Sequence, residues 1–259
     1  MNKTALITGA SNGIGYELAS IHAEHGDDLV VVARTKCKLD VLKKALEKRF
    51  GIAVVIIDKD LSVPGAAEEV FKEVSSRNIT VDYLINNAGF GDVALFAESD
   101  WSKQQRMINL NILALTHLSR LFLPGMISRK SGRILNVAST ASFQPGPTMA
   151  VYFATKSYVL SFSEAINNEV RENGVTVTAL CTGSTESGFH AAAAGEGRHI
   201  KERNLPSARE VAEFGYKSMM KGKAVAIPRI MNSIMATSVR FIPRSIVVKA
   251  ARKMQENKH

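Results

Sequence analysis

Ser139, Tyr152 and Lys156 are the residues of this 259-residue chain whose types and spacing could do chemistry. Tyr152 and Lys156 stand four positions apart in a segment of helical pattern, so they share one helical face. A phenol exchanges protons near neutral pH when its pKa falls, and a neighbouring ammonium in a partly dry pocket lowers it. Ser139, thirteen positions before Tyr152, ends a β-rich run and could hold a substrate oxygen against the phenol. Each residue also has an ordinary structural interpretation, but together they indicate acid–base chemistry on a carbonyl or alcohol.

Short β-branched runs alternate with longer segments of helical periodicity, a pattern typical of a doubly wound parallel sheet. Several of these runs are apolar throughout, as expected when helices cover both faces of a sheet. We expect strands at 4–8, 29–33, 53–58, 83–86, 133–138, 175–181 and 224–228, and helices at 14–25, 39–50, 66–76, 101–126, 150–173 and 208–221. The pattern predicts an α/β, Rossmann-like single domain over 1–229 that binds a dinucleotide and carries the catalytic residues, with a basic helical C-terminal extension over 230–259.

A glycine-rich turn, Thr8-Gly9-Ala10-Ser11-Asn12-Gly13-Ile14-Gly15, joins the first expected strand to the first expected helix. Glycines let the backbone turn tightly and approach a pyrophosphate, whose charge then meets the N–H groups of the helix. The spacing is Gly-x3-Gly-x-Gly rather than Gly-x-Gly-x2-Gly, and a glycine-rich turn without a ligand is the alternative. The expected cofactor contacts in this turn are Gly9, Ser11, Asn12, Gly13, Ile14 and Gly15.

The second expected strand ends at Ala33-Arg34, with Lys36 and Lys38 close behind. An acidic residue near this place would bond a ribose 2′-hydroxyl, whereas an arginine accommodates a 2′-phosphate. Arg34 therefore favours NADPH (NADP+) over NADH, although a solvated basic turn is the alternative.

Further cofactor contacts are expected where the third and fourth strands end. Asp60 could accept a hydrogen bond from the adenine amino group, with Leu61 beside it. Small residues after the fourth strand would let the cofactor approach, and for Asn86 a structural role is at least as well supported. The residues of that segment are Asn86, Asn87, Ala88 and Gly89.

The sequence resembles the short-chain dehydrogenase/reductase family from about residue 3 to about residue 226. The resemblance implies that Tyr152 is the general acid/base, that Lys156 lowers its pKa and binds the ribose, and that Ser139 orients the carbonyl. It also implies that Asn111, rather than Asn109, holds a water of the proton relay, and that faces around 111–123 and 154–170 form a homodimer or homotetramer. The residues that match the family's pattern in order and separation are Thr8, Gly9, Gly13, Gly15, Asp60, Asn86, Asn87, Ala88, Gly89, Asn111, Ser139, Tyr152 and Lys156.

The chain departs from the family's pattern after the sixth expected strand. It has Cys181-Thr182-Gly183 where the family usually has Pro-Gly, and the missing proline would loosen that turn. Ser187 stands where the family commonly has a threonine that touches the nicotinamide carboxamide or phosphate, so a hydroxyl remains available. We expect Gly183 and Ser187 to contact the cofactor. The polar segment 184–205 is a candidate mobile lid, with an ordinary surface loop as the alternative.

The formal net charge of +9 is concentrated towards the C-terminus, where the chain carries seven Lys or Arg and one Glu from Pro228 onward. No base-reading or stacking pattern accompanies these charges, so nucleic acid is not an expected partner. A helix here could lie weakly on anionic lipid. The favoured alternative is an amphipathic helix that packs on the domain or on a partner subunit. The apolar residues that recur at helical spacing in it are Ile246, Val247, Ala250 and Met254.

Two cysteines, Cys37 and Cys181, cannot form a disulfide framework, and neither a signal peptide nor a run of about 18 apolar residues is found. We expect a cytoplasmic enzyme without a metal site. Its expected activity is NADPH-dependent reduction of an apolar ketone or aldehyde, a small-molecule substrate. Oxidation of an alcohol by the same chemistry and a non-catalytic dinucleotide-binding sensor or scaffold are the alternatives. The residues that suggest an apolar substrate are Phe143, Met149, Phe189, Met219 and Met220.

Overall fold

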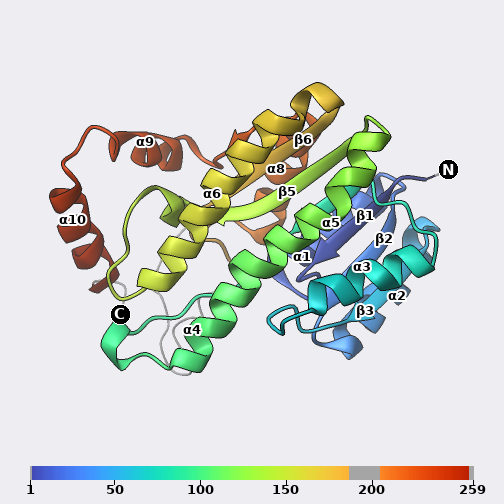
Figure 1. Cartoon of the computed structure of the whole chain (residues 1–259), viewed down its shortest axis with the longest axis horizontal. Coiled ribbons are helices and arrows are strands. Elements are labelled where there is room, and N and C mark those ends of the chain that lie inside the picture. The colour runs from blue at the N-terminus through green and yellow to red at the C-terminus, as the bar shows by residue number, and fades with distance from the viewer. Residues whose placement is uncertain (1, 187–204, 257–259) are drawn as a thin grey trace.

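A parallel sheet of seven strands forms the centre of the molecule in the part of the chain that the structure describes (Figure 1). The structure is a computed structural model that describes residues 2–186 and 205–256, with side chains to residue 253. The strand order is β3-β2-β1-β4-β5-β6-β7, so the winding reverses between β1 and β4, where ligands of such sheets bind. The strands are β1 (Thr4–Thr8), β2 (Asp28–Ala33), β3 (Val54–Asp58), β4 (Tyr83–Asn86), β5 (Gly132–Ser139), β6 (Val175–Thr182) and β7 (Val225–Ala226).

Helices cover both faces of this sheet. One face carries α1, α2 and α8, and the other carries α3, α5 and α6. Successive strand residues point to opposite faces, so Ile7 packs with one layer and Leu6 with the other, which explains why the strands are apolar throughout. The helices are α1 (Gly13–Glu24), α2 (Lys36–Phe50), α3 (Ala66–Ser76), α4 (Trp101–Ile108), α5 (Leu115–Ser128), α6 (Ala150–Val170), α8 (Ala208–Met220), α9 (Ile230–Ser238) and α10 (Arg244–Glu256).

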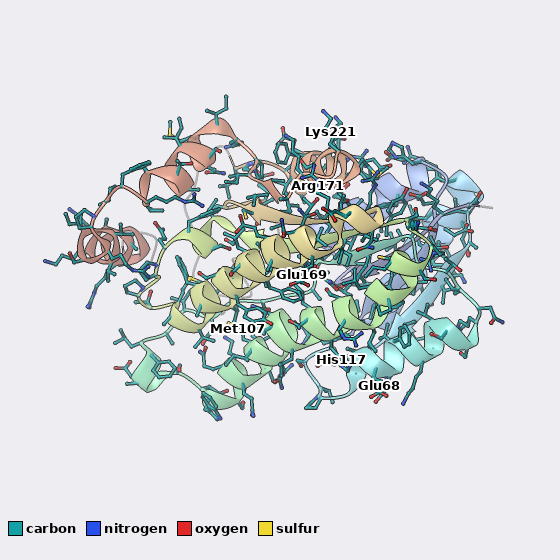
Figure 2. The ribbon with its side chains drawn as sticks, turned by 45° about the horizontal axis from the view of Figure 1, so that its top comes forward. Glu68, Met107, His117, Glu169, Arg171 and Lys221 are labelled. Carbon is teal, nitrogen blue, oxygen red and sulfur yellow. The ribbon has the colours of Figure 1, made fainter. Side chains whose placement is uncertain are left out.

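The predicted fold class is confirmed, and the differences lie at the ends and in the middle of elements. The helix expected over 101–126 is interrupted by a π-helical turn, Asn109–Ala114, between α4 and α5. The strand expected over 224–228 shortens to β7, ahead of Pro228, which has no N–H for a sheet ladder. Figure 2 shows the outer faces of α3 and α5, where Glu68 and His117 are exposed, whereas Met107 of α4 is fully buried.

The continuous helical run Trp101–Ser128 is, among the described residues, long and apolar enough in composition to span a bilayer, with a mean hydropathy of 1.3 over an 18-residue window. Its apolar side chains have another explanation. Leu118, Phe122 and Met126 are buried against the sheet in the same cluster as Leu84 and Ile134. The run is therefore a core helix of the doubly wound fold.

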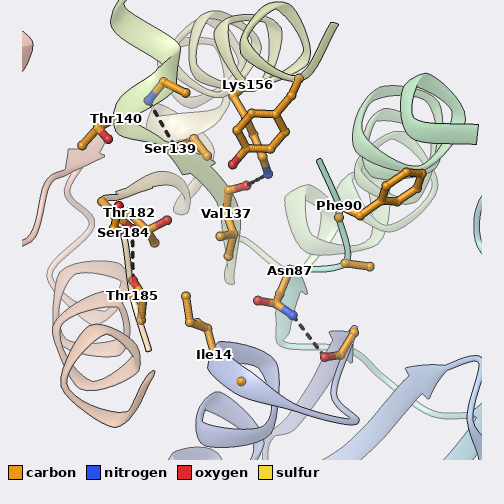
Figure 3. Close-up of a pocket in the computed structure, with 18 of the residues that line it drawn as sticks. Ile14, Asn87, Phe90, Val137, Ser139, Thr140, Lys156, Thr182, Ser184 and Thr185 are labelled. Carbon is orange, nitrogen blue, oxygen red and sulfur yellow. Dashed lines mark hydrogen bonds between the residues drawn. The ribbon is translucent and has the colours of Figure 1, made fainter. Parts of the chain in front are cut away.

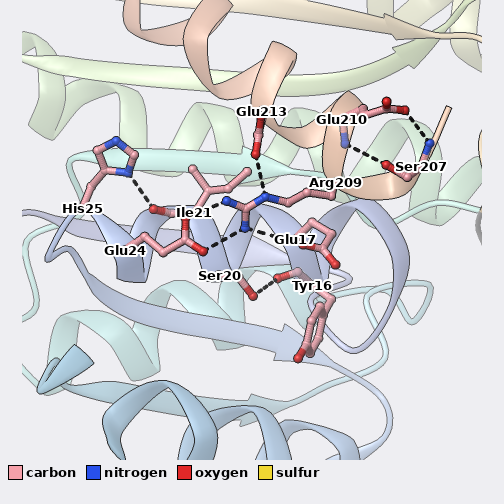
Figure 4. Close-up of polar contacts among 10 residues, drawn as sticks. All are labelled: Tyr16, Glu17, Ser20, Ile21, Glu24, His25, Ser207, Arg209, Glu210 and Glu213. Atoms are coloured by element: carbon pink, nitrogen blue, oxygen red, sulfur yellow. Dashed lines mark hydrogen bonds and ion pairs between the residues drawn. The ribbon is translucent and has the colours of Figure 1, made fainter. Parts of the chain in front are cut away.

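Arg209 links α8 to α1, the helix that begins at the glycine-rich turn (Figure 4). Its guanidinium donates to both carboxylate oxygens of Glu24, at 2.9 and 2.6 Å, and to Glu213 at 2.8 Å. Ser207 and Glu210 cap the start of α8 reciprocally, as each side chain accepts the other's backbone N–H. These contacts hold the start of α8 against α1.

The C-terminal extension contains two helices, α9 and α10, that lie beside the sheet rather than over its faces (Figure 1). Of the apolar face expected in α10, Val247 is buried whereas Ile246 and Ala250 are exposed, and the side chain of Met254 lies outside the described residues. The buried stripe is Val247 with Ala251, one helical turn further along. The helix thus lies where the sequence predicted it, and the expected apolar face is divided between buried and exposed residues.

Candidate active site

A pocket of about 810 Å³ lies at the carboxyl ends of the strands, and most of the expected site residues line it (Figure 3). Gly15 and Asn111 are not among the lining residues, and Ser187 lies outside the described residues. The expected residues that line the pocket are Gly9, Ser11, Asn12, Gly13, Ile14, Arg34, Asp60, Leu61, Asn87, Ala88, Gly89, Ser139, Tyr152, Lys156 and Gly183.

The glycine-rich turn packs on Asn87, which explains its glycines. Asn87 Nδ2 donates to the carbonyl oxygens of Thr8, at 2.9 Å, and of Gly9, at 3.2 Å. A Cβ on Gly15 would overlap the Asn87 side chain and the Gly9 carbonyl, and Gly9 itself has a φ of +69°. Asn87 therefore supports the turn. Gly15 allows the close packing behind the turn and is not part of the pocket wall.

The start of α1 fits the pyrophosphate of a dinucleotide. Its N-cap, Asn12, makes no side-chain capping bond, so that side chain leaves the first N–H groups of the helix uncapped. Asn12 and Gly13 both line the pocket, so these donors lie at its wall. Uncapped N–H groups and the helix dipole together stabilise a bound phosphate. The residues present therefore fit the cofactor that the sequence implies.

The end of the pocket beside β2 carries a cluster of charges. Arg34 and Lys38 line it, and Arg34 Nη1 lies 4.0 Å from Asp60 Oδ2. Asp60 Oδ1 accepts from the Ser62 backbone N–H at 2.9 Å and from its hydroxyl at 2.6 Å, while Arg106 Nη2 lies 3.6 Å from Oδ2. Burial acts to raise the pKa of Asp60, but the Ser62 hydrogen bonds and the two arginines outweigh it and lower that pKa. The Asp60 carboxylate therefore already interacts with Ser62, Arg34 and Arg106 of this chain.

Ser139, Tyr152 and Lys156 converge where β5 ends. The Ser139 hydroxyl hydrogen-bonds Tyr152 and accepts the backbone N–H of Ala141 at 3.1 Å. Lys156 Nζ lies 5.9 Å from the centre of the Tyr152 ring and donates to the Val137 carbonyl at 2.7 Å (Figure 3). All three side chains of the set belong to buried residues.

Burial dominates the electrostatics of this set in the cofactor-free chain. It raises the pKa of Tyr152 to about 12, although the hydrogen bond to Ser139 acts in the opposite direction. Burial also lowers the pKa of Lys156 to about 8. The Lys156 ammonium donates to the Val137 carbonyl. Without a cofactor, Tyr152 is therefore a protonated phenol.

Asn111 lies behind the pocket, in the π-helical turn. Its Oδ1 accepts the Phe90 N–H at 3.2 Å, and its Nδ2 donates to the Phe90 carbonyl at 3.0 Å and to Thr155 Oγ1 at 3.1 Å. These bonds tie the segment after β4 to α6, which carries Tyr152 and Lys156. π-Helical turns often occur at functional sites. Nothing in the amino-acid pattern signalled this one.

Asn86 has the structural role that the sequence allowed for it. Its Nδ2 donates to Asn136 Oδ1 at 2.9 Å and to Ser119 Oγ at 3.1 Å. Asn136 donates in turn to Ser163 Oγ at 2.9 Å. This buried polar chain joins β4, β5, α5 and α6 beneath the site.

Several large apolar side chains also line the pocket. Phe143 and Met149 line it as expected. Met219 is instead fully buried in the core and Met220 packs against that core, so neither faces a substrate, and Phe189 lies outside the described residues. Further apolar residues that line the pocket are Phe90, Val93, Phe153, Leu205, Met235, Ala236 and Val239.

One wall of the pocket is α9, in the predicted C-terminal extension. Asn232, Ala236 and Val239 follow one another at three- and four-residue steps, so they share one helical face, and all line the pocket. Asn232 also approaches Gly183, where an added Cβ would lie 2.7 Å from its Nδ2. The sequence singled out none of these residues, although their helical spacing was the available signal.

A doubly wound sheet with a glycine-rich turn at its winding reversal and a Ser–Tyr–Lys set beside it defines a dinucleotide-binding oxidoreductase fold. The comparisons with known proteins then give the family. The family model described as short chain dehydrogenase matches residues 3–196, and the chain belongs to this family of oxidoreductases. The resemblance inferred from the motifs is confirmed.

Relatives and solved structures agree with this assignment. Human very-long-chain 3-oxoacyl-CoA reductase is 30% identical over 186 residues, which cover 70% of this chain but 58% of that protein. A short-chain dehydrogenase from Sphingobium yanoikuyae in complex with NADPH superposes with a TM-score of 0.82, at 29% identity and 92% coverage of each chain. The bulky-bulky ketone specific alcohol dehydrogenase from Comamonas testosteroni gives 0.79, at 28% identity and the same coverage. The chain thus spans under two thirds of the human relative and nearly all of both bacterial structures.

Proposed function

We propose that this chain is an NADPH-dependent oxidoreductase that reduces an apolar ketone or aldehyde to an alcohol. The observation that carries the proposal is the convergence of Ser139, Tyr152 and Lys156 in a pocket that continues to the glycine-rich turn. When bound, the cofactor supplies the hydride for the carbonyl carbon. Tyr152 donates its proton to the carbonyl oxygen, and the Ser139 hydroxyl holds that oxygen beside the phenol.

Tyr152 carries the proton that carbonyl reduction requires. A phenol with a pKa of about 12 is protonated at neutral pH in the cofactor-free chain. Bound cofactor and substrate must lower that pKa for the proton to leave, and the direction of the reaction follows the cofactor ratio. Two hydroxyls and an amine gathered at one pocket wall also favour catalysis over a non-catalytic scaffold, which needs no such set.

Arg34 and Lys38 support NADPH as the preferred cofactor. Both line the pocket beside β2, where the 2′-position of the adenosine ribose lies in this fold. A guanidinium binds a phosphate through charge-assisted hydrogen bonds, which a free 2′-hydroxyl cannot match. The Sphingobium relative was solved with NADPH.

The apolar pocket wall supports a bulky, apolar carbonyl compound as the substrate. The aromatic rings of Phe90, Phe143 and Phe153 line the pocket together with Met149 and α9. Two relatives are named for such substrates, a very-long-chain 3-oxoacyl-CoA and bulky ketones. The substrate class is thus argued from the lining and from these names together.

We also place the protein in the cytosol as a homodimer or homotetramer. The thiols of Cys37 and Cys181 are free, as is usual in a reducing compartment. Leu113, in the π-helical turn before α5, and Tyr158, in α6, are exposed apolar residues suited to a subunit interface. Light scattering of the full chain tests the assembly, and a monomer at micromolar concentration would contradict it.

A substrate panel tests the activity. Consumption of NADPH and of NADH is followed separately with short aldehydes, short ketones and bulky aryl or long-chain ketones. We expect the highest kcat/KM for a bulky ketone with NADPH, and no turnover in the Ser139→Ala variant at matched cofactor binding. If NADPH binds but no carbonyl compound is reduced, the chain is a dinucleotide-binding scaffold instead.

A further inference from the structure

The two C-terminal helices expose an unusual amount of apolar side chain. Phe241, in the turn between α9 and α10, is 83% exposed, and Ile230 at the start of α9 is 81% exposed. We call the following set the tail surface: Ile230, Met231, Ile234, Phe241, Ile242 and Ile246. These residues come from α9, the turn and α10, three consecutive segments of 17 residues in all, from 230 to 246. Large exposed apolar side chains gathered in one short segment of a globular protein are typical of an interaction site.

Positive charge accompanies the tail surface along the chain. Six exposed cationic residues lie between 229 and 253, and this stretch of the sequence contains no Asp or Glu. They are Arg229, Arg240, Arg244, Lys249, Arg252 and Lys253. Apolar and cationic residues therefore alternate along one short part of the chain.

The opposite sides of both helices already have contacts within the chain. Asn232, Ala236 and Val239 of α9 face the pocket. Val247 and Ala251 of α10 are buried. The tail surface consists of apolar residues on these two helices and their turn that remain exposed.

We propose that the tail surface docks the protein on an anionic lipid membrane. Apolar side chains enter the boundary between headgroups and acyl chains, while the surrounding Lys and Arg bind lipid phosphates. A second copy of this chain is a poorer partner. A symmetric interface here would bring two such cationic surfaces together without a carboxylate from this stretch to pair with them.

Docking would also bring one wall of the pocket to the lipid, because α9 contributes residues to the tail surface and to the pocket wall. Ile234 belongs to the tail surface, and Ala236, two positions further on, lines the pocket. An apolar carbonyl compound dissolved in the membrane would then meet the pocket directly. This consequence rests on the proposed reductase activity, whereas docking itself does not.

Vesicle binding of the full chain tests docking without any activity readout. Co-sedimentation is measured with vesicles of phosphatidylcholine alone and with an equal mixture of phosphatidylcholine and phosphatidylglycerol. We expect binding to the mixed vesicles only, and a strong decrease as salt rises, because screening weakens attraction between exposed charges. Equal binding to both vesicle types, or none to the mixed vesicles, overturns the proposal.

Two double variants separate the apolar and the electrostatic contributions. Ile234→Ser with Phe241→Ser removes apolar contact, and Arg240→Gln with Arg244→Gln removes charge. Each should weaken the partition into mixed vesicles by about tenfold or more. The matched control is Val41→Ser with Lys44→Gln on α2, where both residues are exposed and far along the chain from the tail surface. It should bind as the wild type does.

Thermal unfolding of each variant checks its fold, and the salt and lipid dependence of the wild type gives a result that needs no variant. If the control loses as much binding as the tail variants, the proposal is wrong. If instead light scattering shows that Ile234→Ser with Phe241→Ser dissociates an oligomer while vesicle binding is unchanged, the tail surface is a subunit interface and not a membrane-docking site.

Discussion

The ammonium of Lys156 donates to the backbone carbonyl of Val137 at 2.7 Å. Val137 lies in β5, two residues before Ser139, so the strand that presents one catalytic hydroxyl also holds the catalytic amine. The bond keeps a buried cation in place beside the Tyr152 ring without pairing it with a carboxylate. Burial without a counter-charge lowers the pKa of Lys156 to about 8, which couples this side chain to stability.

Lys156→Met should change how stability depends on pH. In the unfolded chain a lysine holds its proton up to about pH 10.5, whereas folded Lys156 releases it above about pH 8. Between these values the unfolded state binds more protons, so wild-type stability rises with pH. The wild type should gain about 2 kcal/mol relative to Lys156→Met between about pH 7 and about pH 9.5. Urea unfolding at the two pH values measures this.

The control for that experiment is Lys44→Met, at an exposed lysine of α2. Its unfolding free energy should follow the wild type at both pH values. If the unfolding free energy of Lys156→Met changes with pH as that of the wild type does, Lys156 is not a buried cation in solution.

Tyr152→Phe should remove turnover and leave NADPH binding nearly unchanged. The substitution deletes the proton donor and keeps the ring that packs with Phe153, at 6.0 Å between centroids. General acid catalysis is typically worth about 10²- to 10⁴-fold, so kcat should fall by at least that range. Stopped-flow reduction and fluorescence titration of NADPH measure the two effects. Activity within tenfold of the wild type would refute Tyr152 as the acid.

Arg34→Asp should shift cofactor preference towards NADH. An aspartate repels a 2′-phosphate and can accept a hydrogen bond from a 2′-hydroxyl. The ratio of kcat/KM for NADPH to that for NADH should fall by at least about tenfold, because a charge-assisted contact is lost. Arg106→Gln is the matched control, since Arg106 also pairs with Asp60 but does not line the pocket. Equal shifts in both variants would assign the effect to Asp60 rather than to Arg34.

Sequence alone predicted the sheet, the layers and most of the pocket wall, because these depend on local patterns. The β-branched run in Asp28–Ala33, for example, is typical of a strand that is buried on both faces. The carboxyl ends of parallel strands meet at one edge, so Gly9, Ser139 and Gly183 had to lie near one another. Their types then indicated which ligand groups they could meet.

The features of the site that could not be predicted from the sequence depend on contacts between segments that are distant along the chain. The Lys156 amine donates to Val137, nineteen residues earlier in the chain, and burial by the surrounding fold raises the Tyr152 pKa. Asn111, in the π-helical turn, bonds to Phe90 and to Thr155. α9 enters the pocket wall through tertiary packing that its composition does not encode. In each case a partner far along the chain decides the geometry.

His22 is a buried histidine in α1 whose environment favours the neutral ring. Its Nδ1 lies 2.7 Å from Asp27 Oδ2, and its ring lies 5.0 Å, between centroids, from those of Tyr83 and of Tyr216. Among the described residues, its Nε2 has no hydrogen-bond partner. Burial lowers the pKa of His22, and this outweighs the opposing effect of Asp27.

His22→Gln should make the protein less sensitive to mild acid. As pH falls below about 6.5, the unfolded chain protonates this histidine while the folded chain does not, so wild-type stability falls. Glutamine keeps an N–H donor for Asp27 and does not titrate, so the variant should lose less stability between about pH 7.5 and about pH 5.5. Urea unfolding at both values measures the difference, with His25→Gln in the same helix end as the control. An equal loss in the wild type and in His22→Gln would mean that the folded state takes up the proton at His22 as readily as the unfolded chain does.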